Sequence, residues 1–447
     1  MQSEEAIENW LKENNITEVE CLVPDITGNA RGKFIPASKF VKEDSRLPEG
    51  ILAQTVTGEY SDDFWDLLGT VDGDMLLEPD PSTMRLVPWA NEATGQIIHD
   101  CYTKDGKPHP FSSRNVLKRI LDLYKAEGLK PVIAPEVEFY LIEKNLDPDS
   151  ALKPPIGRSG RPETARQSYS IDAANEFEPF VETMYSYGDA MGLDLDTLIH
   201  ESGAAQLEVN FIHGDPLNLS DQVFTFKRMV REAALKHDIY ATFMAKPMAS
   251  EPGSAKHIHQ SVLSEKDGSN IFATADGQYS EAFYSYLGGL QTYTPFVMSF
   301  FAPNVNSYRR FTREVAAPIN LHWGFDNRTT GLRVPDAPPK DYRIENRFPG
   351  ADVNPYLSIA ATLACGYLGL KKGLKASEPF HGNAYEEELA LPRTLEEALR
   401  GLQEDSDIIE IFGKEFIQLY TSIKLVEFEE FNRVISSWER EFLLLNV

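Results

Sequence analysis

The stretch that decides the fold is residues 131–142, PVIAPEVEFYLI, in which Glu136 and Glu138 stand two positions apart in an otherwise apolar, β-branched and aromatic run. Such a run predicts a buried strand. Side chains two apart in a strand project from the same face, so the two carboxylates must share one space. Like charges held close in a half-buried place resist ionisation unless protons or cations accompany them. A solvated edge strand would explain the pair equally well, so the rest of the chain has to decide.

Further predicted strands repeat this spacing of two. Their faces carry Gln206, Glu208 and Asn210 in AAQLEVNF, His257, His259 and Ser261 in KHIHQS, and Arg343, Glu345 and Arg347 in YRIENRF, with Glu201 just upstream of the first. Each face alone has an ordinary explanation, because a lone histidine in a strand is more often a hydrogen-bonded core residue and alternating charges can form an ion-pair ladder. Several such faces in one chain instead favour a shared site on one side of a sheet.

The charged residues of these faces have the chemistry of a hard-metal site. The carboxylates and the imidazole come from Glu136, Glu138, Glu201, Glu208, His257 and Glu345. Oxygen ligands with one imidazole suit Mg²⁺ or Mn²⁺, whereas structural zinc would prefer thiolates. The sequence therefore predicts a site for two or three Mg²⁺ or Mn²⁺ ions.

Arginines crowd into the same part of the chain. Residues 309–347 contain Arg309, Arg310, Arg313, Arg328, Arg333, Arg343 and Arg347. Guanidinium groups bind phosphates and carboxylates in bidentate fashion. Carboxylates for divalent ions beside guanidiniums for a polyphosphate are what phosphoryl transfer requires. The chain has no G-x-x-x-x-G-K-[ST] loop, so it is not a P-loop enzyme, and it has no G-x-S-x-G nucleophile motif.

Length, charge and cysteine content are typical of a large globular protein. The 447 residues are enough for two or three domains. A net charge of −26 argues against nucleic acid as a partner and weakly favours cationic ligands, although solubility is the simpler reason for it. The three cysteines are dispersed, and no apolar run approaches the roughly 18–20 residues that span a bilayer. Together with an acidic start, these features predict a cytoplasmic protein without membrane contact.

Periodicity and turn signals divide the chain into a small N-terminal α+β unit, residues 1–105, and a larger unit, residues 106–447. Ser3 is expected to cap the first helix, and residues 58–81 to be mostly loop. Later helices are expected after Ser112 or Ser113, at 171–191, after a Ser220 cap, at 281–301, at 355–371 and through the C-terminal quarter. Strands are expected at 131–142, 205–212, 240–247, 256–263, 318–325, 330–334 and 341–348.

Six ordered motifs carry a family resemblance. They are PEVEFYL, HESGAAQLEVNF, ATFMAKPM with GSAKHIHQS, NSYRRF, WGFDNRTTGLRVP and YRIENRFPGADVNPYL, and they span nearly the whole chain. In sequence and order they resemble the glutamine synthetase superfamily. The resemblance implies an α+β fold with a small N-terminal β-grasp domain and a larger catalytic domain, whose curved antiparallel sheet is flanked by helices as in guanido kinases. It also implies a homo-oligomeric ring, either a hexamer or a dodecamer of two stacked hexamers, with active sites between neighbouring subunits.

The resemblance also implies a role for each matched residue. One divalent ion would be held by Glu138, Glu201 and Glu208, and the other by Glu136, His257 and Glu345. ATP would contact His259, Ser261, Arg333, Lys340 and Arg343, glutamate would contact Gly253, Arg310 and Arg347, and Arg328 would stabilise the transferred phosphoryl group. In the implied reaction, the γ-carboxylate of glutamate attacks ATP to give γ-glutamyl phosphate. An amine then displaces phosphate to form an amide.

Two departures from the glutamine synthetase pattern bear on the acceptor. True glutamine synthetases carry Asp-Gly-Ser-Ser in the N-terminal domain, where residues 53–66 here read AQTVTGEYSDDFWD, and a flap glutamate where this chain has Ala316. Loss of both carboxylates removes the electrostatic trap for ammonium and leaves room for a carbon chain. The chain is instead similar to the γ-glutamylpolyamine synthetase branch, which has an RGK stretch like Arg31-Gly32-Lys33. The implied acceptors are putrescine, cadaverine, spermidine, spermine or a related amine, in polyamine utilisation or detoxification.

Three further positions qualify this assignment. The first is a group of acidic residues, Glu59, Asp62, Asp63 and Asp66. This group either receives the distal ammonium of the amine or forms a solvated acidic loop. Pro252 stands where relatives carry asparagine, and because proline has no N–H and fixes φ, the assignment of Gly253 is left open. Tyr385 lies where some relatives are adenylylated, but its surrounding motif is altered, so this regulation is not expected.

Three functions therefore remain open. The first is an ATP-dependent ligase that joins glutamate to a polyamine. The second is the same chemistry with ammonia, as in glutamine synthetase, or with a small monoamine such as ethanolamine. The third is a non-catalytic, structural member of the family. The intact set of predicted metal ligands and Arg328 disfavours the third, because buried charges are costly to keep without a use.

Overall fold

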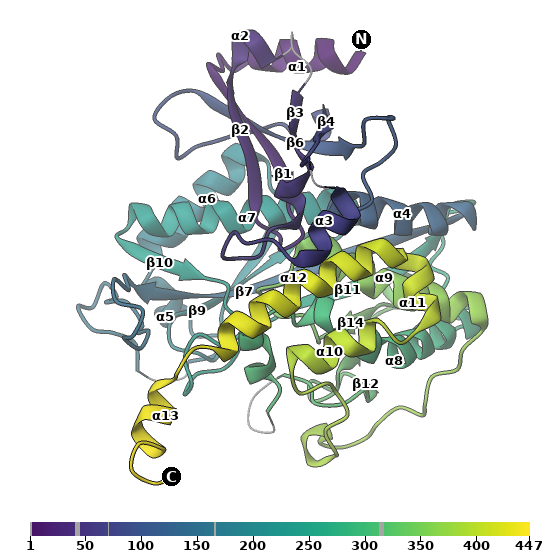
Figure 1. Cartoon of the computed structure of the whole chain (residues 1–447). Coiled ribbons are helices and arrows are strands. Elements are labelled where there is room, and N and C mark those ends of the chain that lie inside the picture. The colour runs from purple at the N-terminus through teal and green to yellow at the C-terminus, as the bar shows by residue number, and fades with distance from the viewer. Residues whose placement is uncertain (1, 41–44, 70, 165–166, 313–316) are drawn as a thin grey trace.

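The structure is a computed structural model that describes residues 2–40, 45–69, 71–164, 167–312 and 317–447, without the side chains of Gln2 and Ser3. Two sheets form within these residues (Figure 1). The first has the order β2-β1-β6-β4-β3, with β5 beside β6, and β1 runs parallel to β6. Its strands are β1 (Glu18–Pro24), β2 (Ala30–Pro36), β3 (Ser45–Pro48), β4 (Asp74–Pro79), β5 (Arg85–Leu86) and β6 (Thr94–Tyr102).

The second sheet has eight strands in the order β12-β13-β14-β11-β7-β9-β8, and β10 extends it from one end of β7. Its strands are β7 (Leu129–Glu143), β8 (Leu195–His200), β9 (Gln206–Phe211), β10 (Ile239–Thr242), β11 (Lys256–Ser264), β12 (Trp323–Phe325), β13 (Leu332–Val334) and β14 (Ile344–Asn346). Its pairings are antiparallel except for β12 with β13. The long central strand β7 is the one predicted from PVIAPEVEFYLI, so the expected organising element is present.

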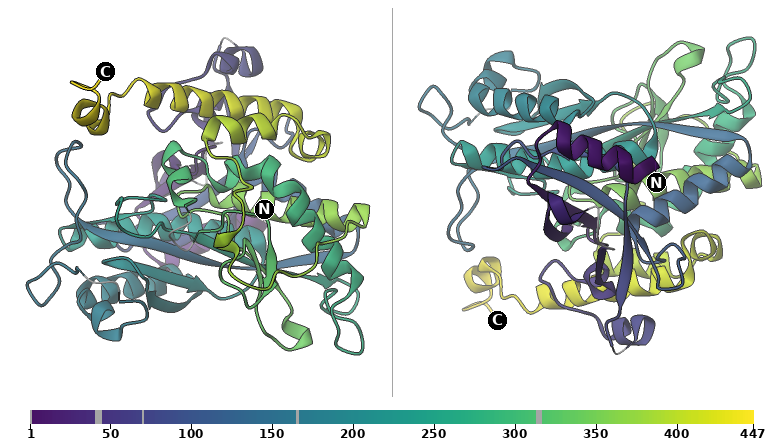
Figure 2. Two further views of the ribbon diagram at one scale, coloured as in Figure 1. Left: turned by 90° about the horizontal axis from the view of Figure 1, so that it is seen from below. Right: turned by 90° about the horizontal axis from the view of Figure 1, so that it is seen from above.

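Helices flank this sheet and connect it to the first. Their bounds are α1 (Gln2–Glu13), α2 (Ala37–Phe40), α3 (Asp62–Leu68), α4 (Ser113–Ala126), α5 (Ile171–Asn175), α6 (Glu178–Met191), α7 (Pro216–Lys236), α8 (Glu281–Phe301), α9 (Pro355–Lys372), α10 (Leu395–Leu402), α11 (Ser406–Phe412), α12 (Lys414–Asn432) and α13 (Ser437–Phe442). Helices α8 and α9 pack together, α4 and α7 contact both α9 and β7, and α12 reaches α3. The short C-terminal helix α13 projects away from the body of the molecule (Figure 2).

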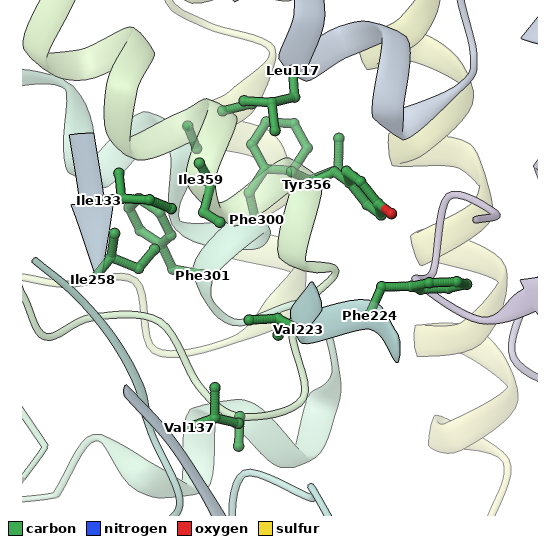
Figure 3. Close-up of a cluster of buried hydrophobic side chains, with 14 of the residues drawn as sticks. Leu117, Ile133, Val137, Val223, Phe224, Ile258, Phe300, Phe301, Tyr356 and Ile359 are labelled. Atoms are coloured by element: carbon green, nitrogen blue, oxygen red, sulfur yellow. The ribbon is translucent and has the colours of Figure 1, made fainter. Parts of the chain in front are cut away.

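Alternation along the strands separates the core from the site. Ile133 and Val137 of β7 and Ile258 of β11 are buried and lie among Phe301, Ile359 and other side chains of the flanking helices (Figure 3). Because successive strand residues point to opposite faces, the even-numbered residues of β7 and the odd-numbered residues of β11 face the other way. The apolar face of the sheet therefore fixes the direction in which the carboxylates and imidazoles point.

Many predicted elements are confirmed. Helix α4 begins after Ser112, whose side chain accepts a hydrogen bond from the Asn115 N–H, and α8 covers the predicted range 281–301. Helix α9 begins after Asn354, whose side chain caps it, and carries Pro355 in its first turn. The mixed α and β content and the two helix-flanked sheets match the predicted α+β class. Ser3, the predicted cap of the first helix, lies inside α1 (Gln2–Glu13) and does not precede it; its side chain lies outside the described part of the chain.

Several predictions were wrong. The strand expected at 240–247 ends at Thr242, and the strand expected at 318–325 is confined to Trp323–Phe325. Residues 58–81 are not mostly loop, since they include α3 and β4. The single helix expected at 171–191 is broken into α5 and α6, because Pro179 at the start of α6 has no N–H with which to continue an incoming helix. Ser220 does not cap α7: Asp215 caps it, and the buried Ser220 hydroxyl donates to the Pro216 carbonyl inside the helix.

The two sheets suggest where domains divide. The first sheet ends at Tyr102, and α4, which leads into the second sheet, begins at Ser113. We propose that the division lies at residues 105 and 106, giving domains 1–105 and 106–447. Among the described residues, no helix combines the length and apolar character needed to cross a bilayer.

Candidate functional site

Strand register brings the charged faces into one row of neighbours. Directly paired positions are Glu136 with His257, Glu138 with Glu208, Glu136 with Asn210, His259 with Glu345, and Arg333 with Glu345. Residues opposite each other in an antiparallel pair have side chains about 4.5–5.5 Å apart at Cβ. The spacing of two seen in four separate stretches of sequence therefore becomes one continuous polar surface on the second sheet.

Two groups within this surface are close enough to hold a metal ion. Ligand atoms of Glu136, His257 and Glu345 lie within 4.8 Å of one another, and so do ligand atoms of Glu138, Glu208 and His257. His257 belongs to both groups, so the two positions adjoin. The first trio is the one that the family resemblance implies for one ion. The second differs from the implied trio in containing His257 where Glu201 was expected.

The second group carries negative charge that its surroundings compensate only in part. Burial and the negative charge of Glu201 together raise the pKa of Glu138 to about 8, against smaller lowering effects of the Ala255 N–H, Arg310 and Arg347. Burial likewise raises the pKa of Glu208 well above its usual range, with further increases from Glu136 and Glu138. Neutral partners such as the Gln206 amide and the Ala255 N–H, at 3.0 and 2.8 Å from a Glu138 oxygen, do not supply a countercharge.

The first group is better compensated. Burial opposes ionisation of Glu136, but hydrogen bonds with His257 and His259 outweigh it and hold the pKa of Glu136 well below its usual range. Burial also opposes ionisation of Glu345, yet Arg347 lowers the pKa of Glu345 to about 2. The guanidinium groups of Arg347 and Arg333 donate to its two oxygens at 2.5 and 2.8 Å. Glu136 and Glu345 are therefore ionised, ready-made oxygen ligands.

These donors fit divalent ions of the Mg²⁺ and Mn²⁺ type. Carboxylate oxygens with a single imidazole are the ligands that such cations accept. Carboxylates as crowded as Glu138 and Glu208 resist ionisation when alone, and a cation removes that resistance. The chemistry of the donor set therefore supports a metal site here.

A large cavity opens beside the first metal group. Its volume is about 1050 Å³, at the upper end of the roughly 300–1,000 Å³ usual for small-molecule sites. All five residues predicted to contact ATP line it, namely His259, Ser261, Arg333, Lys340 and Arg343, and Glu136 lies at its boundary with the metal group. Three cationic side chains beside ionised carboxylates give this cavity the polarity that a nucleotide polyphosphate with divalent ions requires.

One histidine of the cavity has a defined tautomer. The Arg343 Nε–H donates to Nδ1 of His259 at 3.3 Å, so that nitrogen accepts. Nε2 of His259 then carries the proton and donates to Glu136 at 2.9 Å. A chain of hydrogen bonds from Arg343 through His259 thus holds the Glu136 carboxylate between the cavity and the first metal group.

The residues predicted to contact glutamate gather on the other side of Glu345. Arg310 and Arg347 are buried, and in both the Nε–H has no hydrogen-bond partner within the described chain. Such groups are costly unless an anion pairs with them. Tyr385 lies near both arginines. Burial raises the pKa of Tyr385, and the charges of Arg347 and Arg310 lower it by a smaller amount. A Cβ at Gly253 would lie 2.5 Å from the Arg310 Cγ, so glycine is needed for this close approach.

Other predicted residues lie farther from these groups. Arg328 is exposed and near Asp326, which pairs with Arg333 at the cavity wall. Glu201 is half-buried; burial raises its pKa, and the charge of Glu136 raises it further. Ala316, the flap position, and Arg313 lie outside the described residues. The acidic residues Asp62, Asp63 and Asp66 belong to α3, not to a loop.

Sequence reasoning missed the residues that hold the Glu201 turn. The Glu163 carboxylate accepts from the His200 Nε2 at 3.1 Å and from the Ala205 N–H at 2.7 Å, and the His200 Nδ1 lies 2.8 Å from the Glu201 carbonyl. Ala205 has a positive φ of 58°, a strained position for a residue other than glycine. Glu163 comes from a Pro-, Gly- and Arg-rich loop with no periodicity, so no pattern in the sequence points to it.

Replacing Glu163 tests this arrangement. Glu163→Ala leaves the Ala205 N–H and the His200 ring without their buried partner, so we expect the free energy of unfolding in urea to fall by roughly 2–3 kcal/mol. The control is Glu178→Ala, which removes an exposed ion pair with Arg158 and should cost about 1 kcal/mol or less. Equal losses in the two variants would show that Glu163 does not hold the turn.

Comparison with known proteins gives a consistent family. The family model described as "Glutamine synthetase, catalytic domain" matches residues 110–443. Over 444 residues the chain is 35% identical to gamma-glutamylputrescine synthetase PuuA of Escherichia coli (strain K12), covering 97% of this chain and 92% of that protein. Over 448 residues it is 34% identical to glutamate--isopropylamine ligase of a Pseudomonas species, covering 97% and 96%.

Solved structures agree. The GmaS/ADP complex in its conformation 1 superposes with a TM-score of 0.85 at 28% identity, covering 98% of this chain and 99% of that one. GmaS without ligand gives a TM-score of 0.84 at 27% identity, with the same coverage. Members of the matched family are ATP-dependent acid–amine ligases that use divalent metal ions. The chain, with its paired acidic groups beside an arginine-lined cavity, therefore belongs to the glutamine synthetase family.

Proposed function

We propose that this protein joins the γ-carboxylate of glutamate to a primary amine of a polyamine, at the expense of ATP and through γ-glutamyl phosphate. The observation that carries the proposal is the adjacency of three features: two carboxylate-rich metal groups, the cavity lined by His259, Arg333 and Arg343, and the unpaired Nε–H groups of Arg310 and Arg347. Together they provide for cations, a polyphosphate and a carboxylate substrate.

We assign the residues as follows. One divalent ion is held by Glu136, His257 and Glu345, and the other by Glu138 and Glu208 with Glu201; ATP contacts His259, Ser261, Arg333, Lys340 and Arg343; glutamate contacts Gly253, Arg310 and Arg347; and Arg328 contacts the transferring phosphoryl group. When bound, the ions neutralise charge on the phosphoryl oxygens. The chain's own guanidiniums orient the two substrates and stabilise the charge that develops between them.

Arg310 and Arg347 are suited to orient glutamate. Both are buried and rigidly placed, since Arg310 donates to the Phe348 carbonyl at 3.0 Å and Arg347 to Glu345. Fixed donors of this kind need not reorganise during the reaction. The γ-carboxylate oxygen then attacks the γ-phosphorus of ATP and ADP leaves. The amine nitrogen next attacks the γ-carbonyl carbon, phosphate leaves, and the amine loses a proton.

A polyamine acceptor is favoured by charge and by similarity. Helix α3, which begins within the altered Asp-Gly-Ser-Ser region, exposes Asp62 and Asp66, and the chain as a whole carries a net charge of −26. A negative field concentrates multivalent cations. The similarity to the E. coli putrescine enzyme supports the same class. We further propose a cytoplasmic homo-oligomeric ring, a hexamer or a dodecamer, acting in polyamine utilisation or detoxification.

A small monoamine is the second candidate. It is favoured by the 34% identity to the Pseudomonas ligase for isopropylamine, an acceptor with no distal charge. For such a substrate the acidic surface of α3 would have no part in binding. Removing charge from α3 therefore distinguishes the two candidates, because it would weaken binding of a diamine and leave a monoamine unaffected.

An amine panel tests the proposal directly. Phosphate release from ATP and glutamate is measured with putrescine, cadaverine, spermidine, spermine, isopropylamine, ethanolamine and ammonium, and the amide product is identified by mass. We expect the largest kcat/KM with a polyamine. Ammonium as the best acceptor would contradict the proposal, and no release with any amine would favour a non-catalytic role.

A further inference from the structure

A second cavity, of about 240 Å³, lies apart from the site described above. It is bounded by α7, by the turn between β1 and β2 and by α12. Its charged lining consists of Lys227, Arg228, Arg231, Lys424 and a single carboxylate, Asp352. None of these residues lines the large cavity or belongs to either metal group. The proposed ligase reaction leaves this concentration of positive charge without a use.

Two of the cations are already neutralised by neighbours. Arg228 pairs with Glu20 at 2.8 Å, and its other guanidinium nitrogen donates to Gln96. Lys424 pairs with Glu427 at 2.7 Å, and both side chains are nearly fully buried. These pairs explain why the two cations are tolerated in the cavity wall.

The other two cations have no carboxylate partner in contact. The Lys227 ammonium donates only to the carbonyls of Ala351 and Val353, at 2.8 and 3.2 Å. Arg231 makes no hydrogen bond or ion pair with any residue that the structure describes. Both lie 5.3 Å from the centroid of the Phe243 ring, which places the two charges around one side chain.

The positive charges of Lys227 and Arg231 repel each other, and the half-buried Lys227 is affected more than the exposed Arg231. Burial and the nearby charge of Arg231 together lower the pKa of Lys227 to about 7. Burial and, to a smaller extent, the charge of Arg228 lower the pKa of Arg231, but the side chain is exposed to solvent at the mouth of the cavity, so the effect at Arg231 is small. Asp352 opposes the lowering of the Lys227 pKa only in part, and it also raises the pKa of Arg310. An anion in the cavity would remove the repulsion and supply acceptors for unpaired donors.

The surroundings indicate the size of that anion. A neighbouring cavity of about 370 Å³ shares Arg231, Ala241, Thr242 and Met244 with the basic one. Its remaining lining is Ile142, Asn145, Leu152 and Tyr240, which is largely apolar. The space beside Arg231 therefore accepts either a compact anion or one that carries a short carbon chain.

We propose that the cavity lined by Lys227 and Arg231 is a binding site for a small multivalent oxyanion, either phosphate or a short dicarboxylate. Lys227 provides a point charge and Arg231 a planar pair of donors. Phosphate and a dicarboxylate share one property, which is that each is an oxyanion with at least two negative charges. Two charges are expected because two cations of the cavity, Lys227 and Arg231, have no carboxylate in contact.

Calorimetric titration of the full-length protein with inorganic phosphate and, separately, with succinate tests this proposal. We expect Arg231→Gln to weaken binding of the anion roughly tenfold or more, since it removes a charge-assisted hydrogen bond. Arg231→Lys keeps the charge but loses the planar pair of donors, so it should bind the anion more tightly than Arg231→Gln and more weakly than the natural protein. The matched control is Arg393→Gln, an exposed arginine far along the chain, which should leave binding unchanged.

Phosphate can also bind the catalytic arginines, so only the component lost in Arg231→Gln is assigned to this cavity. Binding of phosphate alone would identify a phosphate site, and binding of succinate alone a dicarboxylate site. Absence of both, or equal affinity in the natural protein and Arg231→Gln, would overturn the proposal. Retained thermal stability of Arg231→Gln shows that any loss is not caused by unfolding.

Discussion

Glu208→Gln is expected to reduce ligase activity by about a thousandfold or more while making the metal-free protein more stable at pH 8. The change replaces a carboxylate with an amide of the same shape. It removes the negative charge of one metal ligand and so weakens cation binding. In reactions of this type, several kcal/mol of transition-state stabilisation depend on bound cations. The same change removes one of the like charges that crowd around Glu138.

The stability effect has a definite sign. Burial raises the pKa values of Glu138 and Glu208 in the folded protein. The pH window runs from the unfolded pKa, near 4.3, to the folded pKa, about 8 for Glu138. Within this window the folded metal-free protein binds more protons than the unfolded chain. Stability contributed by these groups is therefore lost as pH rises through this window. Glu208→Gln should show a smaller decrease in Tm from pH 5 to pH 8, measured without metal.

The control for this variant is Glu178→Gln, which alters an exposed glutamate outside the site. It should leave both kcat and the pH dependence of Tm unchanged. A Glu208→Gln protein with natural activity would show that Glu208 does not take part in the reaction. A lower Tm at pH 8 would show instead that the carboxylate is compensated by a partner within the fold.

Arg328→Ala is expected to lower kcat by about a thousandfold without changing the free energy of unfolding. Arg328 is exposed and makes no hydrogen bond or ion pair with the described residues, so its removal costs the fold little. An arginine that stabilises a transferring phosphoryl group is worth roughly 10³–10⁵ in rate in other phosphoryl-transfer enzymes. Activity and stability should therefore separate at this position.

Steady-state kinetics and urea unfolding of Arg328→Ala, Arg328→Lys and Arg309→Ala check this expectation. Arg309 is also exposed in the same arginine-rich segment, but it lies over the Phe431 ring and has no assigned role. Arg328→Lys should recover only part of the rate, because an ammonium cannot reproduce the planar guanidinium. A similar kcat in Arg328→Ala and Arg309→Ala would remove Arg328 from the proposed mechanism.

Local sequence patterns predicted strands of the second sheet because side chains along a strand alternate between its two faces. PVIAPEVEFYLI alternates between core and site from Pro131 to Glu136, and the register of β11 against β7 then places His257 opposite Glu136. Which strands pair cannot be read from periodicity. The order β14-β11-β7-β9 brings together segments more than two hundred residues apart. The repeated spacing of two predicted a shared site, and the family resemblance indicated which residues meet there.

The errors have local physical causes. In residues 58–81, Asp62 and Asp63 suggested solvent, but acidic residues are also favourable in the first turn of a helix, which is where they lie in α3. Ser220 is a weaker capping signal than Asp215 followed by Pro216, and Asp215 is the residue that caps α7. Glu163 and Arg231 were not predicted because their importance depends on partners brought together only by folding.

The central claim is that dispersed carboxylates and one histidine form a pair of adjoining sites for divalent cations. Titration of the metal-free protein with Mn²⁺, followed by electron paramagnetic resonance, counts the bound ions and detects coupling between neighbours. We predict at least two Mn²⁺ per chain with spin coupling in the natural protein, and loss of one ion in Glu208→Gln. Fewer than two bound ions, or two ions without coupling, would contradict the claim.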